Sequence, residues 1–152
     1  MEAFKNAVTI RRTPEEVFTF LADFENVPKW NYAIESTTKV SQGPVGMGTV
    51  YHQIRSIPGR AEEGFEVTVF EPGRRLAIEG TVGPFRARVS YLLESVGNAT
   101  RLTNDVELEP SSTLTRILAP LAVSRVKAAV AENLEELRRI LEADVRARSA
   151  IG

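Results

Sequence analysis

The chain has 152 residues, 43% of them hydrophobic and 26% charged, and a formal net charge of −1. This size and balance predict one soluble domain with a single sizeable core, and they exclude a general attraction for nucleic acid or for anionic membrane surfaces. The absence of cysteine excludes disulfides, thiolate metal sites and cysteine nucleophiles. No apolar run approaches the roughly 20 residues of a spanning helix and no signal core opens the chain, so we expect a cytoplasmic protein with no integral membrane segment.

The first thirty residues predict a strand followed by two short helices. Phe4, Val8 and Ile10 alternate with polar residues, a pattern typical of a strand with one buried face. The sequence TPEE at positions 13–16 supplies an N-cap, a proline at the first helical position and an acid three residues after the cap, so a helix begins there. An Asn-Val-Pro break then separates it from a short second helix that carries Trp30.

The middle of the chain, from about residue 34 to residue 109, predicts an antiparallel meander of six strands. Between its turns the apolar residues alternate with polar ones, so one face of the sheet should be dry and the other wet. Five turn-forming pairs separate the strands: Gly43-Pro44, Pro58-Gly59, Pro72-Gly73, Gly83-Pro84 and Gly97-Asn98.

The last forty residues predict one long helix with a one-sided apolar stripe. Pro120 should kink this helix or split off a first turn. Two acid-before-base pairs at four-residue spacing predict a solvated outer face: Glu135 with Arg139 and Glu142 with Arg146.

A sheet with one dry face and a helix with one apolar stripe must cover each other, which predicts an α+β domain with a curved antiparallel sheet of about seven strands around the helix. The single domain is expected to span 1–148, with a frayed tail at 149–152. Such a sheet offers more apolar surface than one helix can fill, so either bulky side chains fill the interior or a cavity remains. A cavity would make a binding function plausible.

Four stretches of the chain carry a family resemblance: IRRTPEEVFTFLADFENVPKWN (10–31), GPVGMGTVYHQI (43–54), EPGRRLAIEG (71–80) and NATRLTNDVELEP (98–110). In this order they resemble the START-like helix-grip (SRPBCC) superfamily, and within it the bacterial polyketide cyclase/dehydrase-like proteins. The resemblance implies a pocket between sheet and C-terminal helix for sterols, lipids, polyketides or other apolar molecules. It implies no shared reaction, because members of the superfamily include carriers, regulators and cyclases.

Centring each hairpin on its turn predicts which residues face one another on the inner side of the sheet. His52, the only histidine, alternates with Val50 and Ile54 and is therefore expected to point inward. The expected inner pairs are His52 with Val67, Val67 with Ile78, Ile78 with Ala87, Gly80 with Phe85, Ala87 with Leu108 and Tyr91 with Asn104. The candidate ligand-binding residues are His52, Val67, Ile78, Phe85, Val89, Tyr91, Asn104 and Trp30.

Three of these inward residues are polar and could contact a ligand. Tyr91 and Asn104 could instead hydrogen-bond to each other. An imidazole ordinarily titrates near neutral pH, so His52, with Tyr91, is a candidate catalytic acid or base. The two are expected to lie far apart, and no inward acid is expected to orient the imidazole. Glu62 and Glu63 are assigned to a solvated hairpin tip, a lone histidine makes no metal site, and no cofactor is expected.

These observations predict a protein that binds or transports a hydrophobic or amphipathic small molecule, such as a lipid or a polyketide. Trp30 would either pack as core or guard the mouth of the pocket. The first alternative is a polyketide aromatase/cyclase-dehydratase, in which His52 or Tyr91 assists enolisation and loss of water. The second is a protein-interaction module that uses the groove beside the helix. The expected partner is an apolar ligand and not nucleic acid, and the chain is expected to be a monomer or a homodimer.

Overall fold

The structure is a computed structural model that describes the backbone of residues 2–151 and the side chains of residues 2–143. The predicted α+β helix-grip architecture is confirmed. In chain order the elements are β1 (Glu2–Ile10), α1 (Pro14–Ala22), the 3₁₀ turn η1 (Phe24–Asn26), α2 (Val27–Trp30), β2 (Ile34–Lys39), β3 (Val50–Arg55), β4 (Ala61–Glu71), β5 (Arg75–Val82), β6 (Phe85–Val96), β7 (Ala99–Pro110) and α3 (Thr113–Ile151).

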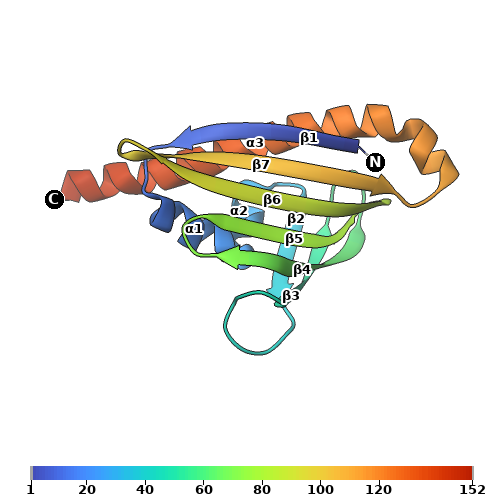
Figure 1. Cartoon of the computed structure of the whole chain (residues 1–152), viewed down its shortest axis with the longest axis horizontal. Helices are drawn as coiled ribbons and strands as arrows, with labels where there is room; N and C mark the ends of the chain where they lie inside the picture. Colours follow the sequence, from blue (N-terminus) through green and yellow to red (C-terminus); the bar gives the residue numbers. More distant parts are fainter. Residues whose placement is uncertain (1, 152) are drawn as a thin grey trace.

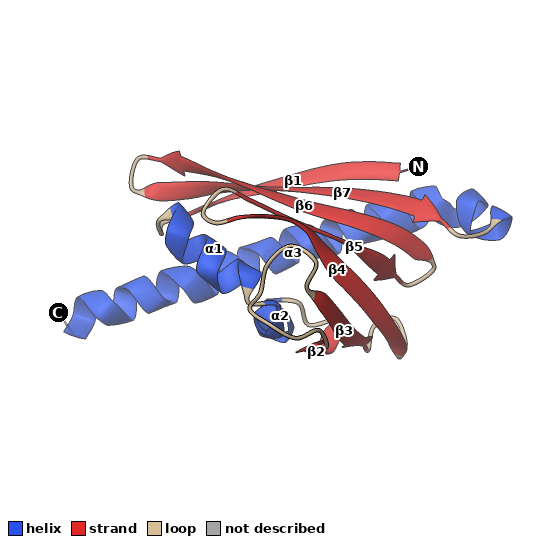
Figure 2. Ribbon diagram, turned by 60° about the horizontal axis from the view of Figure 1, so that its bottom comes forward, coloured by secondary structure: helices blue, strands red, loops and turns tan. Residues whose placement is uncertain are grey.

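The described strands form one seven-stranded antiparallel sheet in the order β1-β7-β6-β5-β4-β3-β2. The first strand pairs with the last one, so β1 and β2 become the two edges, and the connection between them carries α1, η1 and α2. Figure 1 looks onto the sheet with α3 behind it, and Figure 2 shows the helices on one side of the curved sheet. The inner face of the sheet therefore looks toward the helices.

The start of α1 follows its sequence signal. Thr13 is the N-cap, and its Oγ1 accepts a hydrogen bond from the backbone N–H of Glu16 at 3.2 Å. This bond satisfies one of the backbone donors that a helix leaves open at its first turn. Val17, Phe18 and Leu21 then lie on the buried side of the helix and join the core.

The hairpin registers were predicted in part. Three expected pairs are confirmed: Val67 with Ile78, Ala87 with Leu108 and Tyr91 with Asn104. Two are wrong by two residues, since Ile78 faces Val89 and Gly80 faces Ala87, and a shift of two keeps each side chain on the same face. The β3–β4 hairpin is wrong by three residues, because His52 lies opposite Gly64 and not Val67. An odd shift turns the strand over.

α3 is one continuous helix with Pro120 inside it. Figure 1 shows that its first turns bend away from the axis of the rest, as expected beside a proline that removes a hydrogen bond from the helix. The backbone remains helical to Ile151, beyond the expected domain end at 148. The expected fraying at 149–152 falls where no side chain is described, and it stays a prediction.

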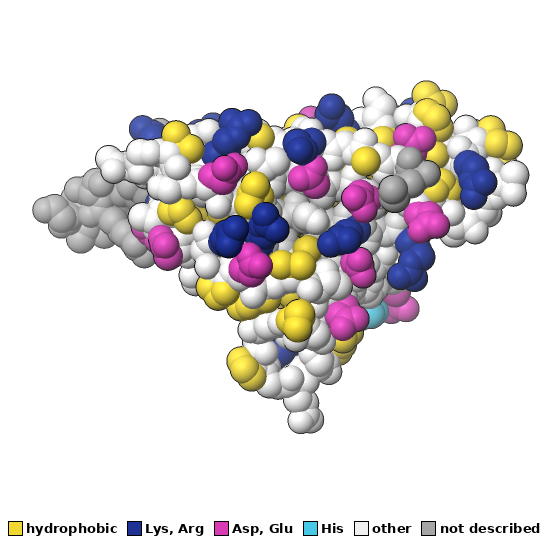
Figure 3. Space-filling model, viewed as in Figure 1, with side chains coloured by type: hydrophobic (Ala, Val, Ile, Leu, Met, Phe, Trp, Pro, Cys, Tyr) yellow, Lys and Arg dark blue, Asp and Glu magenta, His cyan; other side chains and the backbone are white. Residues whose placement is uncertain are grey.

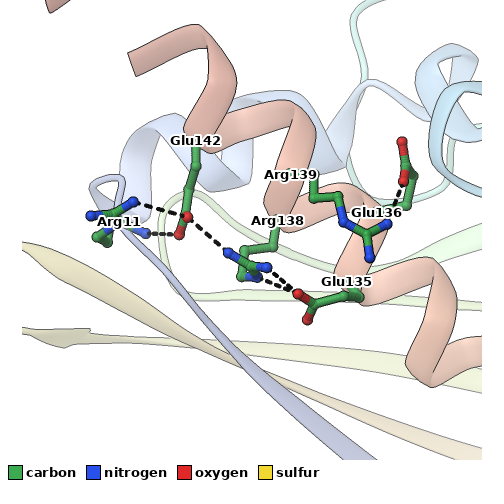
Figure 4. A network of polar contacts seen from close by, with 6 residues as sticks. All are labelled: Arg11, Glu135, Glu136, Arg138, Arg139 and Glu142. Atoms are coloured by element: carbon green, nitrogen blue, oxygen red, sulfur yellow. Dashed lines mark hydrogen bonds and ion pairs between the residues drawn. The ribbon is translucent and has the colours of Figure 1, made fainter. Parts of the chain in front are cut away.

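The C-terminal half of α3 is held by an ionic network (Figure 4). The buried carboxylate of Glu142 accepts hydrogen bonds from the backbone N–H of Arg11 at 3.0 Å and from Arg138 at 2.9 Å, and Arg138 also binds Glu135. The expected pairing of Glu135 with Arg139 is wrong, since Arg139 pairs with Glu136. The side chain of Arg146 lies outside the described residues. Glu142 therefore joins α3 to the end of β1 and does not lie on a solvated face.

Candidate functional site

The apolar interior divides into two clusters. The first lies under α1 and α2 and includes Phe18, Trp30, Tyr91 and the three buried leucines of the C-terminal half of α3, 134, 137 and 141. The second lies at the opposite end of the sheet, where α3 begins, and contains Phe4, Phe85, Ala87, Val106, Leu108 and Ala119.

Between the two clusters four apolar residues keep accessible surface although they face the interior. Ile78 and Val89 lie opposite each other on central strands, in a row that continues to the buried Val67 and Val106. Val126 and Val130 belong to α3. Val130, like Val89, packs against both clusters, and Val126 packs against the second. We call Ile78, Val89, Val126 and Val130 the inner patch. All four are only partly buried, whereas most of the inward residues around them are buried.

Five buried side-chain atoms have no hydrogen-bond partner among the described residues: the hydroxyl oxygens of Thr37 and Thr68, and Trp30 Nε1, Asn104 Oδ1 and Asn133 Oδ1. The last three are the ones that matter for the interior. They come from α2, β7 and α3, the elements that face one another across the interior. Asn104 is 1% exposed, and its amide donates to the carbonyl oxygen of Ser90 at 3.3 Å. The suggested hydrogen bond between Asn104 and Tyr91 is thus replaced by one to the backbone. Sequence reasoning missed Asn133, although an asparagine on the apolar side of a helix is a usable signal.

Tyr91 is buried beside this asparagine on the inner face. Burial raises the pKa of its phenol far above the ordinary value of 10.0, because the charged form loses its hydration. The phenol therefore keeps its proton at neutral pH. It can donate a hydrogen bond, but it is a poor base.

His52 does not lie where alternation predicted it. Its side chain is 44% exposed and its Nε2 is 4.0 Å from Glu62 on the outer face of the sheet. Figure 3 shows this histidine, in cyan, beside acidic side chains. Tyr51 and Gln53 are the inward residues of β3 and both are buried. The predicted inward position of His52 is therefore wrong, and this residue is removed from the candidate site.

The side chain of Tyr51 explains why β3 turns this way. Its ring stacks on Phe65 with centroids 5.1 Å apart, and Phe24 packs against both rings. Burial, together with the negative charges of Asp23 and Glu25, raises the pKa of Tyr51 to about 12. Three aromatic rings bury more apolar surface than Val50 and Ile54 could.

A second correction concerns Glu63, which is 4% exposed and does not lie in a solvated tip. Its carboxylate accepts hydrogen bonds from Gln53 at 2.8 Å, from Arg55 at 2.9 Å and from the backbone N–H of Gly83 at 2.7 Å. Burial favours the neutral acid, but these hydrogen bonds and the charge of Arg55 outweigh it, and the pKa of Glu63 lies below its ordinary value. A fully satisfied polar cluster thus closes the inner face at the β3–β4 hairpin.

The outer face of the sheet has a shallow depression across β5, β6 and β7, lined by Glu79, Arg86, Ala87, Arg88, Glu107 and Glu109. Cross-strand pairing sets Arg88 between Glu79 and Glu107, so opposite charges alternate across the strands. Figure 3 shows the same mixture over this face. We interpret it as a solvated charge ladder.

Within the described part of the chain, no group of three metal-ligating side chains occurs, and no helix has the length and hydropathy of a membrane span.

A family model described as "Polyketide cyclase / dehydrase and lipid transport" matches residues 1–142. The chain belongs to this family. Its place in the START-like helix-grip superfamily is thereby confirmed. Uncharacterized proteins of Mycobacterium tuberculosis and Mycobacterium bovis are 31% identical over 106 residues, which cover 66% of this chain and 61% of theirs. The chain thus spans about three fifths of the length of the curated relatives it matches.

Solved structures share the fold at low identity. A protein of Thermus thermophilus has a TM-score of 0.76 at 19% identity, covering 94% of this chain and 99% of that one. The di-domain ARO/CYC StfQ from the steffimycin biosynthetic pathway has a TM-score of 0.79 at 12% identity, covering 94% of this chain and 51% of that one. A START superfamily protein from Mycobacterium smegmatis has a TM-score of 0.63 at 17% identity, covering 89% and 98%. At these identities the likeness concerns the fold alone.

Proposed function

We propose that this member of the family binds a hydrophobic or amphipathic small molecule between the inner face of the sheet and α3. The observation that carries the proposal is the inner patch, whose four apolar residues are only partly buried although they pack against the buried core clusters. Accessible surface on an inward-facing side chain means that a water molecule can reach it, so these residues are not closed off by packed neighbours. An apolar lining of this kind favours a ligand that is itself removed from water on binding.

The buried polar atoms favour an amphipathic ligand over a pure hydrocarbon. Asn104 and Asn133 each offer an acceptor oxygen, and Trp30 offers an N–H donor, none with a partner among the described residues. A buried polar atom left without a hydrogen bond costs about 1–3 kcal/mol, so a ligand with a hydroxyl, carboxyl or carbonyl group would gain by supplying one. We therefore retain Trp30, Val67, Ile78, Phe85, Val89, Tyr91 and Asn104 as the proposed site and add Asn133. We further propose that the carrier acts in the cytoplasm.

A larger side chain at the inner patch tests the proposal. Val89→Phe should fill the space and reduce the affinity for an apolar fluorescent probe, 8-anilinonaphthalene-1-sulfonate or cis-parinaric acid, at least tenfold. Val96→Phe is the matched control, because the same change then falls on the same strand at an exposed hairpin end. Equal probe binding by both variants would exclude the proposed space. Native mass spectrometry of protein from its own host would identify a co-purified ligand.

A polyketide cyclase-dehydratase is the second candidate, and the neutral phenol of Tyr91 favours it. A buried donor that stays protonated can hydrogen-bond a ketone oxygen and stabilise the enolate that forms during ring closure. Tyr91→Phe removes only this donor and should lower turnover of a poly-β-ketone at least tenfold while the probe still binds. Unchanged turnover would remove Tyr91 from the reaction.

A further inference from the structure

The first turns of α3 present an apolar stripe that no described part of the chain covers. Leu114, Ile117, Leu118 and Leu121 are between 53% and 73% exposed. Their spacing of three and four residues places them on one side of the helix. Ala119, two residues before Leu121 and so on roughly the opposite side, is 1% exposed and belongs to the second core cluster. The stripe therefore faces away from the sheet.

The charge of this segment is one-sided. Between Glu109 and Glu132 the chain contains Arg116, Arg125 and Lys127 and no acidic residue, so the segment carries +3 within a chain of net charge −1. All three basic side chains are exposed, and none forms an ion pair with a described residue. Arg125 lies seven residues after Leu118 and thus continues the line of the stripe. A helix with an exposed apolar stripe and basic residues but no acids is typical of segments that lie on anionic membrane surfaces.

We propose that the first turns of α3, from Leu114 to Lys127, dock on the surface of an anionic lipid bilayer. The apolar side chains enter the boundary between headgroups and acyl chains, and Arg125, on the line of the stripe, meets lipid phosphates. Arg116 and Lys127 lie on other sides of the helix and add attraction at longer range. A second copy of the chain is a worse occupant, because symmetric pairing of this face would bring two segments of charge +3 together. The net charge of −1 gives the whole chain no general attraction for anionic surfaces. In this proposal the attraction comes from the positive charge of this segment.

The docking face adjoins the interior. The backbone N–H of Ser111 donates to the carbonyl oxygen of Pro84 at 3.3 Å, so the start of α3 lies against the β5–β6 turn. Phe85 follows that turn and belongs to the second core cluster, next to the inner patch. Figure 3 shows apolar side chains gathered at the end of the molecule where α3 begins. In a docked protein, the end of the molecule that contains the second core cluster would thus lie at the lipid surface. Docking itself does not require the proposed ligand.

Vesicle sedimentation with the full chain tests the proposal. Wild type should sediment with vesicles of phosphatidylcholine and phosphatidylglycerol, bind vesicles of phosphatidylcholine alone at least tenfold more weakly, and be released by 0.5 M salt (about a fivefold increase over a 0.1 M buffer). Ile117→Glu/Leu121→Glu should weaken binding at least tenfold. Met47→Glu/Val96→Glu is the matched control, since it adds the same charge at exposed apolar residues elsewhere and should bind within about twofold of wild type.

Further arms separate the alternatives. Arg125→Gln/Lys127→Gln should also weaken binding at least tenfold, and it keeps the test decisive should the glutamate variant fail to fold. Equal vesicle binding by wild type and the stripe variants would overturn the proposal. So would a wild-type dimer in sedimentation velocity without lipid that Ile117→Glu/Leu121→Glu converts to a monomer, since the stripe would then be an interface between copies. Val89→Phe should dock like wild type, so failures of docking and of ligand binding are distinguishable.

Discussion

At the scale of single residues, Glu63 shows how a charged side chain can face the interior of this sheet. Its carboxylate receives three hydrogen bonds, one of them from Arg55, whose side chain is itself mostly buried. Glu63 and Arg55 form an ion pair, and Gln53 and the backbone N–H of Gly83 donate the other two hydrogen bonds to the carboxylate. Such a cluster tolerates burial only as a complete set, because removing one member leaves the others desolvated and unpaired.

Glu63→Gln should therefore lower the free energy of unfolding at pH 7 by about 3 kcal/mol, since Arg55 would lose its anion. The folded pKa of Glu63 lies below its ordinary value. The ion pair thus stabilises the fold fully above the unfolded pKa of about 4.3, and this contribution is lost as the pH falls through the folded pKa. Urea unfolding should show that the free energy of unfolding of Glu63→Gln falls below that of wild type by less at pH 3.5 than at pH 7. Glu62→Gln, at the exposed neighbour, should stay within about 0.5 kcal/mol of wild type; a deficit independent of pH would contradict the assignment.

The same cluster explains where sequence reasoning failed at the site. In β3 the apolar residues Val50 and Ile54 alternate with polar ones, and alternation alone turns His52 inward. The polar residues of the opposite parity satisfy one another through Glu63, and Tyr51 joins an aromatic group. Neither effect can be read from one strand in isolation, because each partner comes from another part of the chain. Where the inward residues are apolar, as on β6 and β7, the predicted faces are correct.

At the scale of elements, the β4–β5 pairing depends on Gly80. This residue lies opposite Phe65, and a Cβ added to it would stand 2.1 Å from the carbonyl oxygen of Gly64 and 2.6 Å from the Cβ of Phe65. Backbone atoms cannot yield at such distances without separating the strands. The sequence showed the glycine but assigned it the wrong neighbour, since the aromatic residue beside it is Phe65 and not Phe85.

Gly80→Ala should destabilise the protein by about 3 kcal/mol or prevent folding, because the methyl group overpacks the paired backbones. Gly59→Ala is the control: that glycine has a negative φ and nothing within 4 Å of an added Cβ. The control should be neutral or slightly stabilising. Thermal unfolding followed by circular dichroism compares the two variants, and equal melting temperatures would refute the close approach.

The helix α3 is fixed unequally along its length. Its C-terminal half contributes buried leucines and the Glu142 network, while its first turns show an exposed apolar stripe. The sequence predicted the helix and its proline bend, but it could not place Glu142, because the anchoring backbone N–H belongs to Arg11 at the distant end of β1. The four-residue spacing of Glu142 and Arg146 along the helix, taken alone, predicted a solvated face.

Glu142→Gln should lower the free energy of local opening of the C-terminal half of α3 by about 1–2 kcal/mol. Amide hydrogen exchange between residues 134 and 142 should therefore become faster. Burial would raise the pKa of Glu142, but the hydrogen bond from Arg11 and the charges of Arg138 and Arg11 lower it below its ordinary value. The effect should therefore be present at pH 7 and fade below about pH 4, as the wild-type carboxyl group itself becomes protonated. Glu136→Gln removes only an exposed ion pair and should leave exchange unchanged.

At the scale of the whole molecule, the two core clusters and the inner patch between them set how stability and ligand binding are linked. Close packing stabilises a core through van der Waals contacts. The side chains around an empty ligand space lack these contacts until a ligand binds. A protein of this design should be less stable empty than filled. A substitution that fills the space permanently should leave the ligand-free protein at least as stable as wild type.

Val89→Phe should therefore behave differently from an ordinary core substitution. Without ligand it should melt at or above the wild-type temperature, because the added ring occupies space beside the inner patch. A ligand that binds only the folded state at 100 times its Kd stabilises by about 2.7 kcal/mol, which corresponds to a rise of roughly 5–10 °C for a chain of this size. Wild type and Val96→Phe should show this rise with the co-purified ligand or with cis-parinaric acid, and Val89→Phe should show little of it. A variant that melts well below wild type and still shifts with ligand would mean that Val89 lies in a filled core and that the ligand binds elsewhere.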